Sequence, residues 1–228
     1  MADDAEEFLL IVYATHKGGR YLPFAESLKE QPIGLRNLYV NITNQCDCAC
    51  VFCLRHKKRM AEESSLWLKS EPTTEEVQAA LVAAPWDYIA EVVFCGFGEP
   101  TMRLNDLVTL LKFVREKFPA HKTRLNTNGL AELHWQKDVA PLFAGLLDTV
   151  SISLNAGNAE HYLSLTRNKY GSNSFAGMLR FAENCKAYVP NVVLTVVDKT
   201  IPDAEIEQCR AVCRKRDLTL RIREYEEN

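Results

Sequence analysis

The stretch that decides the fold is residues 37–53, NLYVNITNQCDCACVFC. Its first part, residues 37–43, alternates apolar and polar residues as a β-strand does. Its second part places Cys46, Cys50 and Cys53 in the spacing C-x3-C-x2-C. Three thiolates so close along one loop can bind three corners of an iron–sulfur cube and leave the fourth iron free for a small ligand. We therefore predict that Cys46, Cys50 and Cys53 are ligands of a [4Fe–4S] cluster.

Strand patterns and helix patterns alternate along the rest of the chain. The expected strands are 37–43, 91–95, 122–126, 148–154, 192–197 and 218–224. The runs at 91–95 and 192–197 are dense in apolar residues, which is typical of strands buried on both faces of a parallel sheet. Because parallel strands need crossover connections, the pattern predicts an α/β fold, a partial (β/α)6 TIM-like barrel with the cluster loop after its first core strand.

Helices are expected between these strands. Apolar residues recur at helical spacing over 104–118, and a further helix is expected near 174–187. Thr73 with Glu76 forms a capping-box pattern that opens a helix toward Ala84. Pro202 and Asp203 have the pattern of another helix start. Ahead of this domain (37–228) we expect an N-terminal extension (1–36), with a hairpin over 8–24 around the turn at 17–19.

Composition excludes several classes of protein. The chain has 228 residues and a net charge of −3, so it has no general attraction to nucleic acid or anionic membrane. Its N-terminal apolar run, 8–13, is too short for a membrane span and lacks the flanks of a signal peptide. Of eight cysteines, four lie in one loop, which favours reduced thiols and a cytoplasmic location over a disulfide-linked secreted domain.

The cysteine loop, the strand before it and the β/α alternation over about 37–224 resemble the radical S-adenosylmethionine (SAM) superfamily. Four segments are similar, more narrowly, to the TatD-associated radical SAM proteins: 41–46 (NITNQC), 66–73 (LWLKSEPT), 95–101 (CGFGEPT) and 221–225 (RIREY). The resemblance implies a [4Fe–4S] cluster whose open iron is chelated by SAM. It further implies reductive cleavage of SAM to a 5′-deoxyadenosyl radical, which takes hydrogen from a substrate.

The resemblance also implies which residues bind SAM. The segment at 96–100 would receive the SAM amino group, with Glu99 as hydrogen-bond acceptor. Polar residues at the next strand ends would contact its methionine and ribose moieties, Arg167 its carboxylate, and Phe52 and Val197 the side of adenine. The full set of candidates is Phe52, Gly96, Gly98, Glu99, Pro100, Asn126, Ser153, Asn155, Arg167 and Val197. The alternatives are a plain strand-end turn at 96–100, an Asn-Gly turn at Asn128 and a solvated loop arginine at 167.

Other conspicuous residues have structural alternatives. Cys48 is expected to be a bystander thiol, because one short loop lacks the two separated knuckles of a structural zinc site. The remaining cysteines either pack in the core or form an auxiliary cluster. The basic run 55–59 is either solvated charge, a docking patch for an acidic electron donor or a surface facing an anionic substrate. Trp67 either lines the substrate entrance or packs. The cysteines of the auxiliary-cluster alternative are Cys95, Cys185, Cys209 and Cys213.

Taken together, the sequence predicts a radical SAM enzyme acting on an unknown substrate. A flavodoxin or ferredoxin is expected as reductant, and neither nucleic acid nor membrane as partner. Two alternatives stay open. One is a glycyl-radical-type activase, whose substrate is a partner protein. The other is a non-catalytic metal-binding or electron-transfer module that binds zinc or a ferredoxin-like cluster.

Overall fold

One curved sheet organises the chain, seen in a computed structural model that describes residues 10–16, 20–57 and 65–225. Its strand order is β2-β1-β3-β4-β5-β6-β7-β8. From β3 to β8 every neighbouring pair is parallel, whereas β1 pairs antiparallel with both β2 and β3. The order confirms the predicted fold class, with β3 as the first core strand. The strands are β1 (Val12–His16), β2 (Arg20–Pro23), β3 (Arg36–Val40), β4 (Ile89–Phe94), β5 (Lys122–Thr127), β6 (Thr149–Ser153), β7 (Asn191–Val197) and β8 (Thr219–Arg223).

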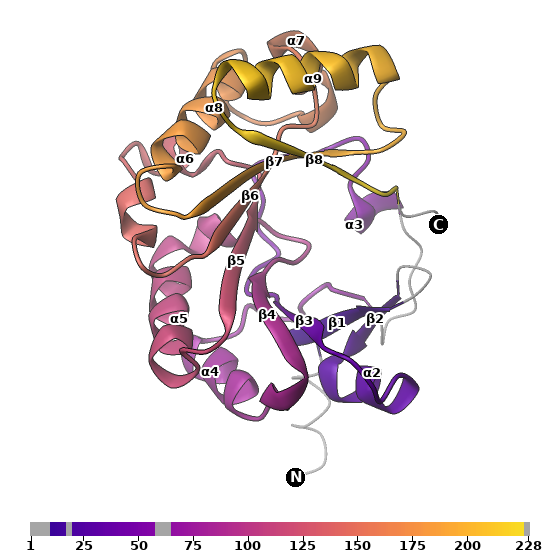
Figure 1. The fold of residues 1–228 in the computed structure, drawn as a ribbon, viewed down its shortest axis with the longest axis vertical. Helices are drawn as coiled ribbons and strands as arrows, with labels where there is room; N and C mark the ends of the chain where they lie inside the picture. Colours follow the sequence, from indigo (N-terminus) through magenta and orange to yellow (C-terminus); the bar gives the residue numbers. More distant parts are fainter. Residues whose placement is uncertain (1–9, 17–19, 58–64, 226–228) are drawn as a thin grey trace.

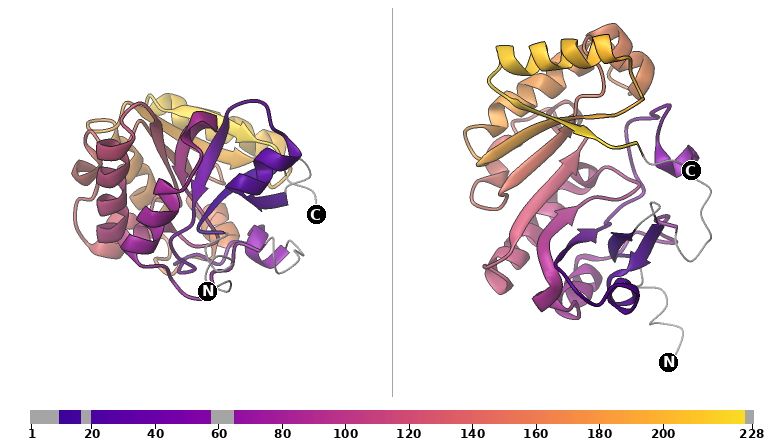
Figure 2. Two further views of the ribbon diagram at one scale, coloured as in Figure 1. Left: turned by 90° about the horizontal axis from the view of Figure 1, so that it is seen from below. Right: turned by 45° about the vertical axis from the view of Figure 1, so that its right-hand side comes forward.

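Helices cover the convex side of this sheet (Figures 1 and 2). The α-helices are α2 (Phe24–Glu30), α3 (Leu54–Lys57), α4 (Thr74–Val82), α5 (Leu104–Lys117), α6 (Ala131–Trp135), α7 (Ala159–Thr166), α8 (Asn173–Cys185) and α9 (Asp203–Lys215). Three short 3-10 helices join them: η3 (Trp86–Tyr88), η4 (Pro100–Arg103) and η5 (Ala140–Phe143). The two ends of the sheet, β8 and the β1–β2 pair, face each other across an open side. The barrel is therefore partial.

Local sequence explains where the main helices begin. Thr73 accepts a hydrogen bond from the Glu76 amide at 3.2 Å, and the Glu76 carboxylate accepts one from the Thr73 amide at 2.7 Å. This is the predicted capping box, and α4 starts directly after it. Pro202 precedes α9, whose buried stripe includes Ile206, Cys209 and Cys213, as predicted.

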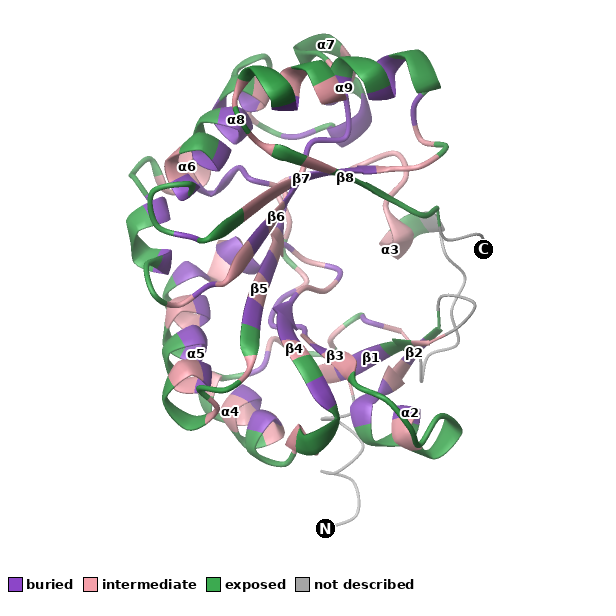
Figure 3. Cartoon of the chain, viewed as in Figure 1, coloured by how far each residue is buried: buried purple, intermediate pink, exposed green. Residues whose placement is uncertain are grey.

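The two faces of the sheet differ in burial. In β6 the outward side chains of Val150 and Ile152 are completely buried under helices, whereas Ser151 and Ser153 are only partly buried. Figure 3 shows the matching pattern on the helices, with buried residues toward the sheet and exposed residues outward. Successive strand residues point to opposite faces, so the packed core lies outside the barrel wall and the interior is polar. The interior is thus a place for a ligand.

The hairpin strands continue the same sheet. β1 pairs with β2 from Tyr13↔Pro23 to His16↔Arg20, while Val12 and Tyr13 pair with β3. The expected turn at Lys17-Gly18-Gly19 lies outside the described residues. The division into an extension (1–36) and a core domain (37–228) stays a prediction.

Candidate functional site

The cysteine loop follows β3 and is hydrogen-bonded to the end of α7 and to the segment between α7 and α8. The Ala49 amide donates to the Thr166 carbonyl and the Val51 amide to the Leu165 carbonyl, both at 2.9 Å. The Lys169 amide donates to the carbonyl of Asp47 at 3.2 Å. Backbone bonds from residues more than a hundred positions away therefore fix the loop where it leaves the sheet.

The four thiols of the loop differ in burial and ionisation. Cys46, Cys50 and Cys53 are partly exposed, while Cys48 is buried. Hydrogen bonds to the Cys46 and Cys50 sulfurs raise the pKa of Cys48, and the hydrogen bond from Cys48 lowers the pKa of Cys50. Burial raises the pKa of Cys53. The partly exposed sulfurs therefore belong to the three cysteines of the C-x3-C-x2-C motif, and the buried one belongs to Cys48.

This donor set fits an iron–sulfur cluster. All four sulfurs of the loop are free thiols, and soft thiolates are the ligands that such clusters take. The ligand atoms of Cys46, Asp47 and Cys48 lie within 4.8 Å of one another, a group that is also able to bind a single ion. The bystander role of Cys48 therefore stays a prediction that metal analysis of variants can test.

Asp47 is a site residue that the sequence did not reveal. Its carboxylate accepts hydrogen bonds from the Asn128 side-chain amide and from the Tyr170 hydroxyl, each at 2.7 Å. These bonds tie the cysteine loop to the end of β5 and to the start of α8. Asn128 also accepts a bond from the Leu130 amide at 2.9 Å, so it both forms the turn and holds the loop. Only the position of Asp47 beside Cys46 and Cys48 hinted at this role.

Glu99 has an unexpected set of partners. Its carboxylate, 4% exposed, accepts hydrogen bonds from the Thr101 amide (3.1 Å), the Thr101 and Thr127 hydroxyls (both 2.8 Å) and the Asn128 amide (2.7 Å). Burial raises the pKa of Glu99, and these four bonds oppose the shift. The carboxylate therefore joins the ends of β4 and β5 from within, and its contact with a SAM amino group stays a prediction.

Glycine at 96 and 98 has a packing reason. A Cβ on Gly98 would lie 2.2 Å from the Thr43 carbonyl oxygen, and one on Gly96 would lie 2.0 Å from the side-chain oxygen of Asn41. Both contacts are shorter than atoms tolerate, so larger residues would push the β4 loop away from the loop after β3. Gly96 and Gly98 therefore let the loop after β3 pass close to the β4 loop, and their contact with SAM stays a prediction.

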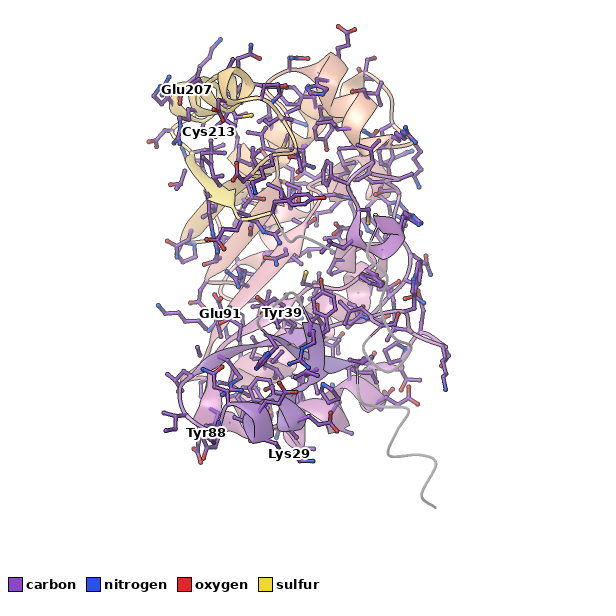
Figure 4. The ribbon with its side chains drawn as sticks, turned by 90° about the vertical axis from the view of Figure 1, so that its right-hand side faces the viewer. Lys29, Tyr39, Tyr88, Glu91, Glu207 and Cys213 are labelled. Carbon is purple, nitrogen blue, oxygen red and sulfur yellow. The ribbon has the colours of Figure 1, made fainter. Side chains whose placement is uncertain are left out.

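The site contains a cavity of about 360 Å³ on the inner side of the sheet. Residues of the hairpin strands and of β8 line it on either side. Figure 4 is viewed from the open side of the barrel, and Tyr39 lies there near the middle, between the N-terminal strands and the C-terminal half. Several predicted SAM or cluster residues line it together: Phe52, Cys53, Gly96, Asn126, Ser153 and Val197. The third cysteine of the motif therefore faces the same space as polar groups from β5 and β6.

Other predicted residues lie outside this lining. Asn155 is buried, in a left-handed backbone conformation (φ 61°), and its amide donates to the Thr195 carbonyl at 3.3 Å. Arg167 ends α7, also left-handed (φ 46°), and is exposed. Residues absent from the lining also include Cys46, Cys50, Gly98, Glu99 and Pro100. The lining of one cavity thus contains half of the SAM candidates and one of the three motif cysteines, and Glu99 follows the lining residues Gly96 and Phe97 in the sequence.

The four cysteines of the auxiliary-cluster alternative lie in different surroundings. Cys185, Cys209 and Cys213 are buried in α8 and α9, and the burial raises the pKa of Cys209 to about 12 and that of Cys213 to about 11. These thiols pack in the core. Cys95 instead lines the cavity.

The basic run after the loop is described only in part, since Lys58 and Arg59 lie outside the described residues. Arg55 donates to the Cys48 carbonyl at 3.1 Å and lies 5.9 Å from the centre of the Trp67 ring. Trp67 is 45% exposed and packs edge-on against Phe97. Arg55 therefore supports the cysteine loop, and Trp67 is both packed and accessible.

No helix in the described part of the chain is long and apolar enough to cross a membrane.

Comparison with known proteins places the sequence in a broad group. The profile of the Radical SAM superfamily matches residues 40–212. GTP 3′,8-cyclase from Corynebacterium glutamicum is 34% identical over 139 residues, 58% of this chain and 34% of that protein. A probable GTP 3′,8-cyclase from Thermococcus kodakarensis is 28% identical over 191 residues, 83% of this chain and 57% of that protein. The chain thus spans from about a third to just over half of these relatives.

Solved structures share the fold. Streptococcus suis SuiB bound to S-adenosylmethionine has a TM-score of 0.64 at 19% identity, over 90% of this chain and 44% of SuiB. A radical SAM methyltransferase from Sphaerobacter thermophilus has a TM-score of 0.58 at 15% identity, over 94% of this chain and 73% of that protein.

Proposed function

Since the chain belongs to the radical SAM superfamily, we propose that Cys46, Cys50 and Cys53 bind a [4Fe–4S] cluster whose fourth iron takes SAM. When bound and reduced by an external donor, the cluster would supply one electron to the sulfonium of SAM, whose cleavage to methionine would let the 5′-deoxyadenosyl group take a hydrogen atom from a substrate and leave as 5′-deoxyadenosine. The enzyme's own residues bind, orient and shield these groups.

The arrangement of the cavity carries the proposal. Cys53 and Phe52 of the cysteine loop line the same space as Gly96 after β4, Asn126 of β5 and Ser153 of β6. Ligands of barrel folds lie at the carboxyl ends of the strands, which is where these residues are. A small molecule held by the strand ends would therefore contact the cluster directly.

Each cavity residue has a proposed task. Asn126 and Ser153 offer hydrogen bonds to the methionine or ribose part of SAM, and Phe52 and Val197 offer apolar contact for adenine. Glu99 is the proposed acceptor for the amino group, with Gly96 and Phe97 of the same segment lining the cavity, and its bond from the Asn128 amide fixes the turn. Arg167 and Asn155 stay candidates that require movement of their loops to reach SAM.

We further propose that the chain belongs with the TatD-associated branch, whose likeness rests on residues 41–46, 66–73, 95–101 and 221–225. A flavodoxin or ferredoxin is the proposed reductant, and the cytoplasm the proposed location. The GTP 3′,8-cyclases that match cover 58% and 83% of this chain, and the chain covers 34% and 57% of their length, so GTP is a substrate to test rather than one that the comparison assigns.

The test is anaerobic reconstitution with iron and sulfide, followed by dithionite and SAM. Formation of 5′-deoxyadenosine and methionine in equal amounts is the expected result. A colourless, zinc-loaded protein that leaves SAM intact would support the metal-binding module instead. An activase would yield a glycyl radical signal on an added partner protein rather than turnover of a metabolite.

A further inference from the structure

The cavity has a basic wall that the proposed SAM contacts do not use. Arg124 of β5 and Arg221 and Arg223 of β8 line it, and within the described lining Glu224 is the one carboxylate. We call Arg124, Arg221 and Arg223 the arginine wall. Because Glu91 pairs with Arg124 and Glu224 is the one carboxylate of the described lining, three guanidinium groups meet two carboxylates, and this part of the cavity keeps a net positive charge.

Strand periodicity accounts for the direction of these side chains. In β8, Arg221 is paired with Thr195 and Arg223 with Val197 of β7, and Val197 itself lines the cavity. Residues two apart along a strand share a face, so Arg221 and Arg223 both point inward. In β5 the same rule places Arg124 on the face of Asn126, which also lines the cavity.

The wall has spare hydrogen-bonding capacity. A terminal nitrogen of Arg124 lies 3.2 Å from the Glu91 carboxylate, but its Nε is buried and without a partner among the described residues. In the described part of the chain, the guanidinium groups of Arg221 and Arg223 make no hydrogen bond or ion pair. Buried donors are nearly always satisfied in folded proteins, so an orphaned arginine nitrogen beside a cavity indicates a missing acceptor.

The opposite wall supplies no acceptor of matching charge. Tyr13, Tyr21, Tyr39 and Phe97 line it, and three of their ring pairs are in contact, with centroid distances of 5.2 to 6.4 Å. Aromatic rings there offer apolar surface and hydroxyl groups. A ligand that fills the cavity would therefore meet cationic donors on one side and rings on the other.

We propose that the arginine wall binds an anionic group, carboxylate or phosphate, of the substrate on which the proposed SAM chemistry acts. Guanidinium groups bind both oxyanions through paired N–H donors; Arg124 is largely buried, whereas Arg221 and Arg223 are exposed at the mouth of the cavity. That the anion belongs to the substrate rests on the proposed function. That the arginine wall binds an anion can be tested without SAM cleavage.

The experiment measures anion binding to the cluster-loaded protein in the oxidised state, saturated with SAM, by isothermal titration calorimetry. Saturating SAM occupies any site for its own carboxylate, and an oxidised cluster prevents turnover. The probes are inorganic pyrophosphate for phosphate and succinate for carboxylate. The variants are Arg223→Gln and, as a matched control, Arg214→Gln. Arg214 is an exposed arginine of α9 that does not line the cavity.

At least one probe is expected to bind, with affinity about tenfold weaker in Arg223→Gln and unchanged in Arg214→Gln. Preference for pyrophosphate or succinate then identifies the source of the anionic group. The proposal is overturned if neither probe binds, if both variants weaken binding equally, or if Arg223→Gln weakens SAM itself as much as the probe. A sample that makes 5′-deoxyadenosine but binds no anion refutes this inference alone, whereas anion binding without 5′-deoxyadenosine refutes the proposed function.

Discussion

The cysteine loop and the arginine wall border the same cavity but differ in whether their polar groups have hydrogen-bond partners within the protein. Around the loop, polar atoms of Asp47, Glu99 and Asn128 have protein partners at 2.7 to 3.1 Å. On the wall, the described structure leaves Arg221, Arg223 and the Nε of Arg124 without acceptors. Hydrogen bonds within the protein fix the geometry of the loop, and we call Asp47, Glu99, Asn128 and their partners the frame. The donors of the arginine wall are instead available to a ligand, so we infer that the wall recognises one.

The largest expected effect tests which thiols are ligands. Cys50→Ala should lose most of its cluster iron and reduce 5′-deoxyadenosine formation to background, because two thiolates cannot hold the cube. Cys48→Ala, the matched control from the same loop, should keep both, since Cys48 is buried and lies outside the C-x3-C-x2-C spacing. Iron analysis and the product assay check the pair, and equal iron loss in both variants would assign Cys48 to the metal.

Substitution of Glu99 tests whether the hydrogen bonds that its carboxylate accepts stabilise the frame. Glu99→Ala should lower the free energy of unfolding by about 3 kcal/mol, because several buried donors lose their acceptor. For a chain of this length that corresponds to a fall in Tm of roughly 6 to 12 °C by circular dichroism. Glu99→Gln keeps one oxygen as acceptor and should lose less. An unchanged Tm in Glu99→Ala, with weakened SAM binding, would instead mean that the carboxylate serves SAM.

A smaller effect is expected from a single bond of the frame. Tyr170→Phe removes the hydroxyl that donates to Asp47 at 2.7 Å, which should cost about 1 kcal/mol of loop stability. Release of cluster iron to a chelator should then become roughly fivefold faster. Tyr188→Phe is the control, since Tyr188 is an exposed tyrosine outside the cavity lining. Equal release rates in both variants would remove Tyr170 from the frame.

An effect of similar size tests the arginine wall. Glu91→Gln removes the carboxylate that competes for Arg124, and should raise pyrophosphate affinity by about 1 kcal/mol, roughly fivefold. The same titration that tests Arg223→Gln measures it. Weaker binding in Glu91→Gln would mean that Glu91 orients Arg124 rather than competing for it.

Sequence reasoning reached the fold because local rules dominate there. Thr73 and Glu76 specify a helix start by their own chemistry, and the spacing of Cys46, Cys50 and Cys53 needs no distant partner. Strand positions followed from apolar runs, since β3 to β7 bury the side chains of their outer face under helices. These features lie within a few residues of one another along the chain.

What the sequence did not provide are contacts between distant segments. Asp47 meets Tyr170 only because the α7–α8 segment packs on the cysteine loop, and no local pattern encodes that meeting. The contacts of Glu99 with Thr127 and Asn128 likewise join segments far apart in the sequence, and its contact with the SAM amino group stays a prediction. The inward direction of Arg221 and Arg223 likewise depends on the register of β8 against β7.

The most direct test of the central claim is the electron paramagnetic resonance spectrum of the dithionite-reduced cluster, recorded with and without SAM. Three protein thiolates leave one iron for SAM, so SAM is expected to change the g-values of the cluster signal, and Glu99→Gln should retain that change. A reduced cluster signal that saturating SAM leaves unaltered would mean that the fourth iron already has a protein ligand, and would contradict the account.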